Sequence, residues 1–463
     1  MAEFEVRAAY DQALITTLRR HTREESFAAL AECHALYENR EGWIPKAERI
    51  AVLERAAALV EAREEDLATQ AAREGGKPYM DSLVEVRRGI QGIRAAVHEL
   101  HGFGGREIPM SLTKSSEGRM AYTFRDPRGV VMAISAFNHP FNLIIHQVIP
   151  AFAVGCPVLV KPATTTPLSC KALIDILHEA GAPKAWCRML LCDNDTASEL
   201  VADSRTAFLS FIGSARVGWM LRSKLGPGAA CALEHGGVAP AIVDETANLD
   251  DAIPLLTKGG FYHAGQVCVS VQRIYVHASI ADQFTERFVA AAKALKVGDP
   301  VEEDTEVGPL ILPKEVDRVA EWVKEAVDGG AKLLCGGEKL SDTTYAPTVL
   351  REPPEDAKVS QQEVFGPVVS IYPYTDLDDA IARANKPDAY FQASIFTQNL
   401  ERAMKVHRHL HGMAIMVNDH TAFLVDWMPF GGHKSSGLNA GGIGFSMHDM
   451  TLERMVVFRS PSL

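Results

Sequence analysis

The amino-acid sequence predicts an α/β fold: two doubly wound parallel-sheet domains with a small β-ribbon element. Two blocks of the chain, from about 130 to 225 and from about 234 to 418, alternate short apolar strands with amphipathic helices. Two further segments, 118–129 and 450–460, alternate apolar and polar residues as exposed strands do. The length of 463 residues is enough for two or three domains.

The first hundred residues are predicted to be helical. Apolar side chains recur at helical spacing at Ile50, Leu53, Ala57, Val60, Leu67 and Ala71. Gly75-Gly76 ends this helical face, and Pro78 follows just beyond it. We therefore expect one helical stretch that reaches residue 75.

The two α/β blocks supply the strands of the predicted sheets. In the first block we expect strands at 130–134, 157–162, 189–191 and 206–211, with helices at 172–180 and 215–225. In the second block the expected strands are AIVDE (241–245), RIYVH (273–277), AKLLCGG (331–337), VVSIYPY (368–374), ASIF (393–396) and AIMVN (414–418).

The ribbon is predicted from two distant segments. GRMAYTFRDPRG (118–129) alternates apolar and polar positions, with a turn expected at Asp126-Pro127. MTLERMVVFRS (450–460) alternates in the same way and can pair with it. Such a ribbon leaves an unpaired sheet edge, which a monomer would have to cover.

Composition excludes several classes of protein. The chain has 47 basic and 59 acidic residues, a net charge of −12, and no basic run, so nucleic-acid binding is not expected. The most apolar stretch, 148–160, is shorter than the roughly twenty residues of a membrane span, and the N-terminus lacks a secretory signal. Eight scattered cysteines without metal-binding spacing favour a reducing cytoplasm.

Three residues stand where chemistry is possible. Cys268 lies between Gly265 and a β-branched segment, where its sulfur can face a cleft, although a lone cysteine also suits a buried core position. Glu234 has apolar neighbours, which suits a general base, or it is a carboxylate held by backbone amides. Asn138 precedes Pro140, where its amide either donates to an oxyanion or stabilises a turn. The residues alone leave these alternatives open.

Seven motifs occur along the chain in the order FNHP, VLVKPATTTPLS, FIGSARVG, LEHGG, GQVC, EVFGPV and PFGGHKSSG. Together they resemble the aldehyde dehydrogenase superfamily, in its NAD(P)-dependent, non-acylating form, over essentially the whole chain. The resemblance implies a dinucleotide-binding domain at 1–108 and 128–235 and a catalytic domain at 236–436. It also implies an oligomerisation ribbon and C-terminal tail at 109–127 and 437–463, and hence a homodimer or homotetramer.

The resemblance implies a covalent reaction that oxidises a small-molecule aldehyde to a carboxylate. Cys268 would attack the aldehyde carbon and form a thiohemiacetal, whose oxyanion would be held by Asn138 and the Cys268 amide. Loss of hydride to the nicotinamide gives a thioester, which is hydrolysed by a water that Glu234 activates.

The expected cofactor is NAD or NADP. The resemblance assigns cofactor contacts to Phe137, Lys161, Thr164, Gly213, Ser214, Val217, Glu363 and Phe365. NAD-preferring members usually carry a glutamate where this chain has Thr164, and loss of that carboxylate removes repulsion against a 2′-phosphate. We therefore expect that NADP is accepted.

The predicted substrate pocket is polar. Its candidate residues are Arg87, Arg88, His139, His146 and His420. Such side chains favour a short polar or anionic aldehyde, for example a hydroxy- or phosphoaldehyde. The two arginines are also compatible with a solvated helix face.

Other functions remain open at this point. A CoA-acylating relative would pass the thioester to a thiol, although Glu234 argues against it. A non-catalytic structural protein on the same fold is a second alternative, and a hydrolase that pairs Cys268 with His263 is a third. His407, His409 and His411 have spacing that could bind a metal, but a cationic helix end accounts for them, and no metal is expected. NAGG (439–442) replaces an arginine-glutamate pair that is usual in the family.

Overall fold

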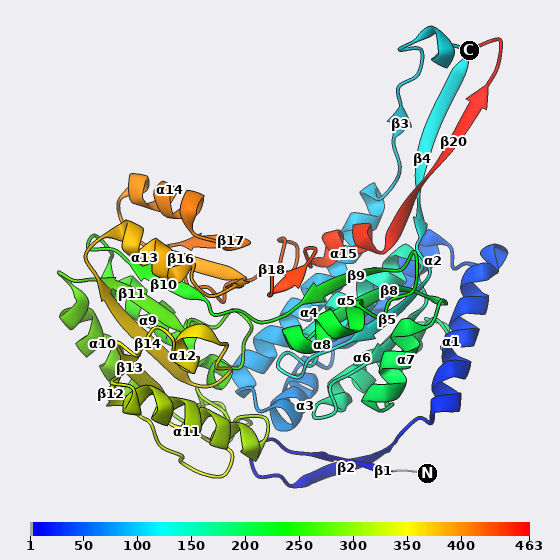
Figure 1. The fold of residues 1–463 in the computed structure, drawn as a ribbon. Coiled ribbons are helices and arrows are strands. Elements are labelled where there is room, and N and C mark those ends of the chain that lie inside the picture. Colours follow the sequence, from blue (N-terminus) through cyan, green and yellow to red (C-terminus); the bar gives the residue numbers. More distant parts are fainter. Residues whose placement is uncertain (1–2) are drawn as a thin grey trace.

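A computed structural model describes residues 3–463, in which two α/β lobes lie side by side and a ribbon projects from one of them (Figure 1). The first lobe contains a six-stranded sheet in the order β19-β9-β8-β5-β6-β7, parallel except for β19. Its strands are β5 (Val130–Ile134), β6 (Val158–Lys161), β7 (Cys187–Met189), β8 (Thr206–Ile212), β9 (Ala230–Glu234) and β19 (Gly437–Leu438). The predicted parallel sheet is confirmed, although β9 was not expected.

Helices cover this sheet and bury its apolar residues. They are α1 (Arg23–Glu38), α2 (Lys46–Glu61), α3 (Glu64–Gly75), α4 (Tyr79–Gly102), α5 (Asn142–Val154), α6 (Pro167–Glu179), α7 (Asn194–Ala202), α8 (Ala215–Arg222) and α15 (Ile443–Asp449). The apolar stretch 148–160 forms the buried end of α5, the following turn and most of β6. Helix α4 approaches α5 closely because Gly89 has no side chain: a Cβ there would lie 2.5 Å from Ile145 Cδ1.

The second lobe contains a seven-stranded sheet in the order β12-β13-β14-β11-β10-β16-β17, parallel except for β12. Its strands are β10 (Pro240–Val243), β11 (Arg273–His277), β12 (Lys332–Cys335), β13 (Thr348–Arg351), β14 (Val368–Tyr374), β16 (Gln392–Phe396) and β17 (Ala414–Val417). Its helices are α9 (Leu249–Phe261), α10 (Ala281–Ala294), α11 (Pro313–Asp328), α12 (Lys358–Gln361), α13 (Leu377–Ala384) and α14 (Leu400–His409). Six strands match the predicted segments, and β13 was missed.

The predicted pairing of the ribbon is confirmed. Strands β4 (Arg119–Pro127) and β20 (Thr451–Arg459) pair antiparallel over nine residues, and β3 (Glu107–Ile108) lies on the other side of β4. The turn expected at Asp126-Pro127 is wrong, because both residues still pair with β20, and the chain turns after them at Gly129. Figure 1 shows the ribbon extending well away from the lobe.

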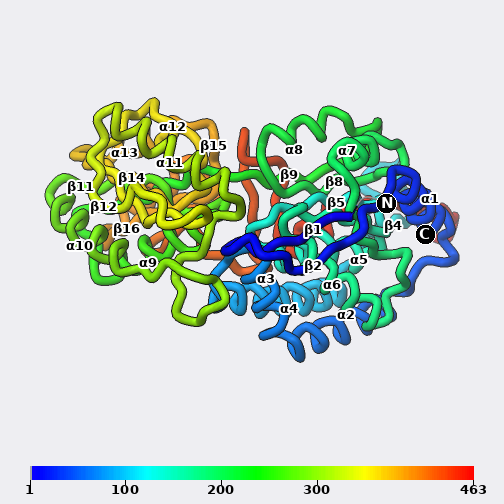
Figure 2. Tube along the Cα trace, turned by 90° about the horizontal axis from the view of Figure 1, so that it is seen from below, coloured from blue at the N-terminus to red at the C-terminus, as the bar shows by residue number. Residues whose placement is uncertain are grey.

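The helical prediction for the N-terminal region is wrong in two places. Residues 3–19 form a hairpin of β1 (Glu3–Arg7) and β2 (Leu14–Arg19), which crosses in front of the first lobe and reaches toward the second in Figure 2, a view from below. Its turn contacts the second lobe, where the Thr343 hydroxyl donates to the Tyr10 carbonyl at 2.6 Å. The expected single helix is two helices, because Arg63 leaves helical geometry at φ −125° and ψ 20°. None of the helices formed by residues 3–463 is long and apolar enough to cross a membrane.

Candidate active site

The carboxyl ends of four neighbouring strands of the first sheet carry the predicted site residues. Asn138 follows β5, Lys161 ends β6, Gly213 follows β8 and Glu234 ends β9. Because parallel strands end at the same edge of a sheet, residues that are up to 96 positions apart in the chain meet there. Ligands of open α/β sheets bind at this edge.

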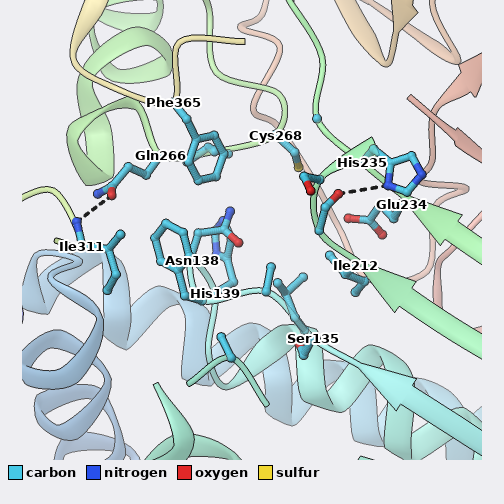
Figure 3. A pocket seen from close by; sticks show the side chains of 18 of the residues that line it. Ser135, Asn138, His139, Ile212, Glu234, His235, Gln266, Cys268, Ile311 and Phe365 are labelled. Carbon is cyan, nitrogen blue, oxygen red and sulfur yellow. Dashed lines mark hydrogen bonds between the residues drawn. The ribbon is translucent and has the colours of Figure 1, made fainter. Parts of the chain in front are cut away.

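A cavity of about 830 Å³ opens at this edge and extends to the second lobe. Figure 3 shows Cys268 facing the space above Asn138, with Phe365 on one side and Glu234 on the other. Twelve further predicted site residues and neighbours line it: Arg88, Phe137, His139, His146, Lys161, Thr164, Gly213, Ser214, Val217, Tyr262, Gln266 and Glu363. The structure therefore brings the three catalytic candidates and all eight cofactor candidates to one cavity.

The loop that presents Cys268 is held from both sides. Buried Gln266 accepts from the Ile311 amide at 2.9 Å and donates to the Pro309 carbonyl at 3.0 Å. After Cys268, the Thr421 hydroxyl donates to the Val269 carbonyl at 2.6 Å. These bonds fix the backbone on both sides of the sulfur. A nucleophile held in this way meets its substrate in a constant geometry.

The backbone before this loop adopts an unusual conformation. His263, Ala264 and Gly265 have positive φ values of 51°, 53° and 70° in succession. A Cβ at position 265 would lie 2.2 Å from the Gly366 carbonyl oxygen, so only glycine fits there. Strained backbone of this kind persists where the surrounding structure fixes it, as it does around functional sites.

Burial dominates the electrostatics of the cavity. It raises the pKa of Glu234 to about 8, and no hydrogen-bond partner among the described residues reaches its Oε1 atom. The pKa of Cys268 is raised well above its usual value, first by burial and then by the carboxylates of Glu234 and Glu363. A carboxyl group with a pKa near neutrality is suited to general-base chemistry.

Glu363 lies against glycine backbone. A Cβ at Gly236 would lie 1.8 Å from Glu363 Oε1, so the missing side chain makes room for the carboxylate. Burial raises the pKa of Glu363 to about 8, and its Oε1 atom has no hydrogen-bond partner in the described part of the chain. Nearby, the rings of Phe137 and Phe365 meet edge to face, with centroids 5.7 Å apart. A planar ligand ring and a ribose hydroxyl would fit this corner.

The other end of the cavity suits a dinucleotide. Gly213 precedes Ser214, the N-cap residue of α8, and helix N-termini favour anions such as pyrophosphate. Lys161 is buried, and burial lowers the pKa of its ammonium group. Thr164 is exposed at the rim. The unpartnered Glu363 oxygen, the glycine backbone and the lysine together fit the expected dinucleotide.

The substrate candidates divide into two groups. Arg88 and His146 line the cavity, and both bind buried Asp426: Arg88 Nη2 lies 2.9 Å and His146 Nε2 2.7 Å from its Oδ1 atom. Asn142 donates to the same carboxylate at 3.0 Å. Burial raises the pKa of Asp426, but these partners, His146 first, more than offset that effect and lower it. His139 also lines the cavity.

Arg87 and His420 are not among the residues that line the cavity. Arg87 is half-exposed and pairs with Glu64 on α3, as expected of a solvated helix face. The His420 Nδ1 atom accepts from the Ala422 amide at 3.1 Å, within its own loop. We leave both out of the substrate site.

The structure also places the other histidines that the sequence singled out. His263, considered as a base for Cys268, is fully buried and does not line the cavity. His407 and His409 lie at the end of α14 and His411 just beyond it, and residues 3–463 contain no group of three His, Cys, Asp or Glu side chains that could hold a metal ion.

Sequence reasoning missed several residues that shape the site. Lys77, Glu85 and Asp426 are buried and charged, and each contacts a residue that lines the cavity. Gln266 was noted only as part of a motif. A lysine and a glutamate eight positions apart around the start of a helix were the one available signal, but that spacing alone does not indicate a pair.

Comparison of this chain with protein-family models and with known proteins identifies the same family. A model of the aldehyde dehydrogenase family matches residues 1–456. The 3-sulfolactaldehyde dehydrogenase of Priestia aryabhattai is 41% identical over 411 residues, which cover 89% of this chain and 86% of that protein.

Solved structures resemble this chain along nearly all of its length. Aldehyde dehydrogenase 21 from Physcomitrella patens, in complex with the reaction product succinate, superposes with a TM-score of 0.96 at 35% identity, over 99% of this chain and 95% of that chain. The glyceraldehyde-3-phosphate dehydrogenase GapN of Methanocaldococcus jannaschii, complexed with NADP, gives a TM-score of 0.94 at 33% identity, over 99% of both chains.

Proposed function

Because this chain belongs to the aldehyde dehydrogenase family, we propose that the cavity at the edge of the first sheet is its active site. The protein is an NAD(P)-dependent enzyme that oxidises an aldehyde to a carboxylate. The convergence of Cys268, Asn138 and Glu234 on one cavity is the observation that carries the assignment of roles.

Cys268 is the proposed nucleophile. Its thiol loses a proton to solvent, and the thiolate adds to the aldehyde carbon. The carbonyl oxygen becomes an oxyanion that accepts from the Asn138 amide and the Cys268 N–H. A bound nicotinamide, held by the residues named below, would supply the acceptor for the hydride that leaves the thiohemiacetal carbon. The remaining thioester adds a water whose proton passes to Glu234, the carbon–sulfur bond breaks, and the carboxylate and the free thiol are released.

The proposed cofactor contacts follow the cavity from end to end. Lys161 binds the adenosine ribose, the backbone at Gly213 and Ser214 binds the pyrophosphate, with Val217 beside it, and Glu363 binds the nicotinamide ribose. Phe137 and Phe365 enclose the ring. Thr164 places no carboxylate near the 2′ position, so NADP is accepted, as in the NADP-bound relative. Thr164→Glu should therefore shift preference toward NAD about tenfold in kcat/KM.

The proposed substrate is a short polar or anionic aldehyde. Arg88, His139 and His146 line the cavity, and we call them the substrate wall. Their polar side chains suit a short polar or anionic aldehyde better than a fatty one. Relatives named for sulfolactaldehyde and glyceraldehyde 3-phosphate support the same class.

We further propose a homodimer or homotetramer built through the ribbon, in the reducing cytoplasm. Exposed apolar side chains on the two long ribbon strands include Phe124, Met455, Val457 and Phe458. Such a surface favours a second copy of the chain. All eight cysteines are free, which agrees with a reducing compartment. The proposed division into a cofactor domain (1–108 and 128–235), a catalytic domain (236–436) and a ribbon with tail is supported by the two separate sheets.

The test is a panel of aldehydes incubated with NAD or NADP, with reduced nicotinamide and intact protein mass measured together. We expect reduction with short hydroxylated, sulfonated or phosphorylated aldehydes and slower reduction with long alkanals. Cys268→Ala should abolish reduction and the covalent adduct, whereas Cys335→Ala, at a buried cysteine in β12 outside the cavity, should retain both.

Two results would overturn this proposal. One is full activity of the Cys268→Ala variant. The other is a thioester that persists in water and is released only when coenzyme A is added, because that result identifies an acylating enzyme.

A further inference from the structure

A buried charged pair lies directly behind the substrate wall of the cavity. Lys77, between α3 and α4, places its Nζ atom 2.5 Å from Glu85 Oε2 on α4, and both side chains are 1% exposed. The same Nζ atom lies 2.5 Å from His139 Nδ1. One ammonium group therefore joins a buried carboxylate to a histidine that lines the proposed substrate site.

Glu85 also fixes the segment that carries this histidine. Its Oε1 atom accepts from the backbone amides of Phe141 and Asn142, each at 2.9 Å. These amides lie at the start of α5, where the N–H groups have no partner within the helix. The segment from Asn138 to α5 is thus anchored to the Lys77–Glu85 pair at both His139 and the helix start.

The contact with Lys77 fixes the proton on the imidazole. A lysine ammonium group has donors and no acceptor, so His139 Nδ1 accepts, and a neutral ring then carries its proton on Nε2. Burial and the neighbouring positive charge of Lys77 hold the pKa of His139 well below its usual value. The ring is therefore neutral at physiological pH, with an N–H on the side away from Lys77.

That N–H faces the cavity. His139 lines it, and its side chain is 14% exposed, although Nδ1 is turned toward a lysine that is almost fully buried. No described residue forms a hydrogen bond with Nε2, and the rings of Tyr262 and His263 are 6.5 Å away between centroids. Arg88 and His146 are both bonded to Asp426. The Nε2–H group of His139 has no such partner among the described residues and can donate to a ligand in the cavity.

We propose that Lys77 is a positioning residue that holds His139 in its Nε2–H form, and that His139 thereby recognises an oxygen acceptor beside the aldehyde carbon. This inference rests on the proposed function, because it concerns the substrate of the same site. His139 follows Asn138 directly, so its donor lies next to the group that holds the carbonyl oxygen. The preferred substrates are aldehydes that carry an oxygen on the second carbon.

The donor role makes a prediction that an acceptor role does not. An ether oxygen accepts a hydrogen bond but cannot donate one. Methoxyacetaldehyde should therefore be recognised as well as glycolaldehyde, whereas butanal, which has a methylene group in place of the ether oxygen, should not. The measured quantity is the kcat/KM ratio of each oxygenated aldehyde to butanal, compared between variants so that intrinsic reactivity cancels.

His139→Phe should lower both ratios about tenfold, the effect of one well-placed neutral hydrogen bond. The matched control is His178→Phe on α6, a histidine outside the cavity, which should leave both ratios within twofold. An unchanged methoxyacetaldehyde ratio in His139→Phe, with a fall for glycolaldehyde alone, would show that the ring accepts and would overturn the proposal.

The role of Lys77 is tested with a double substitution, because replacing Lys77 alone would leave the buried charge of Glu85 unpaired. Lys77→Met combined with Glu85→Gln removes both charges, while the glutamine carbonyl can still accept from the amides at the start of α5. With the tautomer no longer fixed, both ratios should fall about threefold, and adding His139→Phe should lower them no further than His139→Phe alone. Independent, multiplicative losses would overturn the positioning role.

The proposed function and this inference fail in different ways. If the unchanged enzyme reduces neither cofactor with any aldehyde, the proposed function is wrong. If it is active but the ratios do not respond to His139→Phe, the active site stands and the inference is wrong.

Discussion

The two walls of the active-site cavity satisfy their charges in different ways. One wall, which we call the cofactor wall, includes the proposed base Glu234 and the proposed ribose ligand Glu363. Each buries one carboxylate oxygen without a partner among the described residues, and burial raises both pKa values to about 8. On the substrate side, Asp426 has three partners, and Lys77 and Glu85 neutralise one another.

This difference indicates which wall depends on a ligand. An unpartnered buried carboxylate is costly, and a water or a ribose hydroxyl that donates to it recovers part of that cost. The charged groups behind the substrate wall are already paired, so this wall can bind a polar substrate with little rearrangement. We therefore expect substitutions in the cofactor wall to change turnover and its pH dependence. We expect substitutions in the substrate wall to change the free energy of unfolding and the choice of aldehyde.

The largest expected effect is on the cofactor wall. Glu234→Gln should lower steady-state turnover about 10²- to 10⁴-fold, because the amide cannot take a proton from the attacking water. Hydride transfer should still occur once, so that a burst of reduced cofactor accompanies an acyl adduct on Cys268. Rapid-mixing absorbance and intact mass measure the two signals.

A loss of the burst together with the steady-state rate would contradict the assignment of Glu234 to hydrolysis alone. It would place Glu234 before hydride transfer, as the base that deprotonates Cys268. Glu74, a buried carboxylate that caps α6 through the Leu168 and Ser169 amides, lies outside the cavity, and its Gln variant is the matched control.

The second effect concerns stability of the substrate wall. Asp426→Ala leaves Arg88 and His146 partly buried without their partner, and we expect a loss of about 3 kcal/mol in the free energy of unfolding. Urea unfolding measures it. The control is Glu61→Ala, which breaks the exposed pair with Arg94 and should cost less than about 1 kcal/mol. Equal losses in the two variants would contradict a structural role for the Asp426 network.

The two walls also differ in how far the sequence predicts them. The strand ends that carry Asn138 and Lys161 were predicted, because apolar strands and their following motifs are local patterns. Strand β9, which ends at Glu234, was missed, although the LEHGG motif that contains Glu234 was noted. The Arg88–Asp426 pair joins residues 338 positions apart, and no local pattern encodes it. The β1–β2 hairpin was missed because its strands are short and largely exposed, so they lack a strong apolar signal.

Helix geometry alone predicts that Arg87 and Arg88 do not both belong to the substrate site. Consecutive residues on a helix point about 100° apart, so Arg87 and Arg88 cannot both face the same narrow cavity. The sequence offers both as candidates. Only the packing of α4 against α5, where Gly89 lies against Ile145, decides that Arg88 faces inward.

The third effect tests the fit of Glu363. Gly236→Ala places a methyl group where the carboxylate lies, and displacement of the nicotinamide ribose should lower kcat/KM for the cofactor about 10²-fold. The KM for the aldehyde should change far less. Gly228→Ala, where a Cβ meets nothing within 4 Å, controls for the loss of a glycine, although its φ of +83° adds local strain. Similar losses for both reactants would contradict a role for Gly236 confined to the cofactor wall.

The smallest effect is the pH dependence of hydrolysis. A base with a pKa of about 8 is mostly protonated at pH 7, so the rate of thioester hydrolysis should rise about tenfold between pH 7 and pH 9. An ordinary glutamate would give a flat profile in this range.

The free energy of unfolding changes with pH in the opposite direction. A raised pKa means that the folded state favours protonated Glu234 and Glu363, so their stabilising contribution is lost as pH rises through about 8. Single-turnover decay of the acyl adduct, followed by mass across this range, measures the profile apart from Cys268 ionisation. If the decay rate stays flat while the burst rate rises with pH, the titrating group is the Cys268 thiol. The pH sensitivity expected of the cofactor wall would then come from Cys268 and not from Glu234.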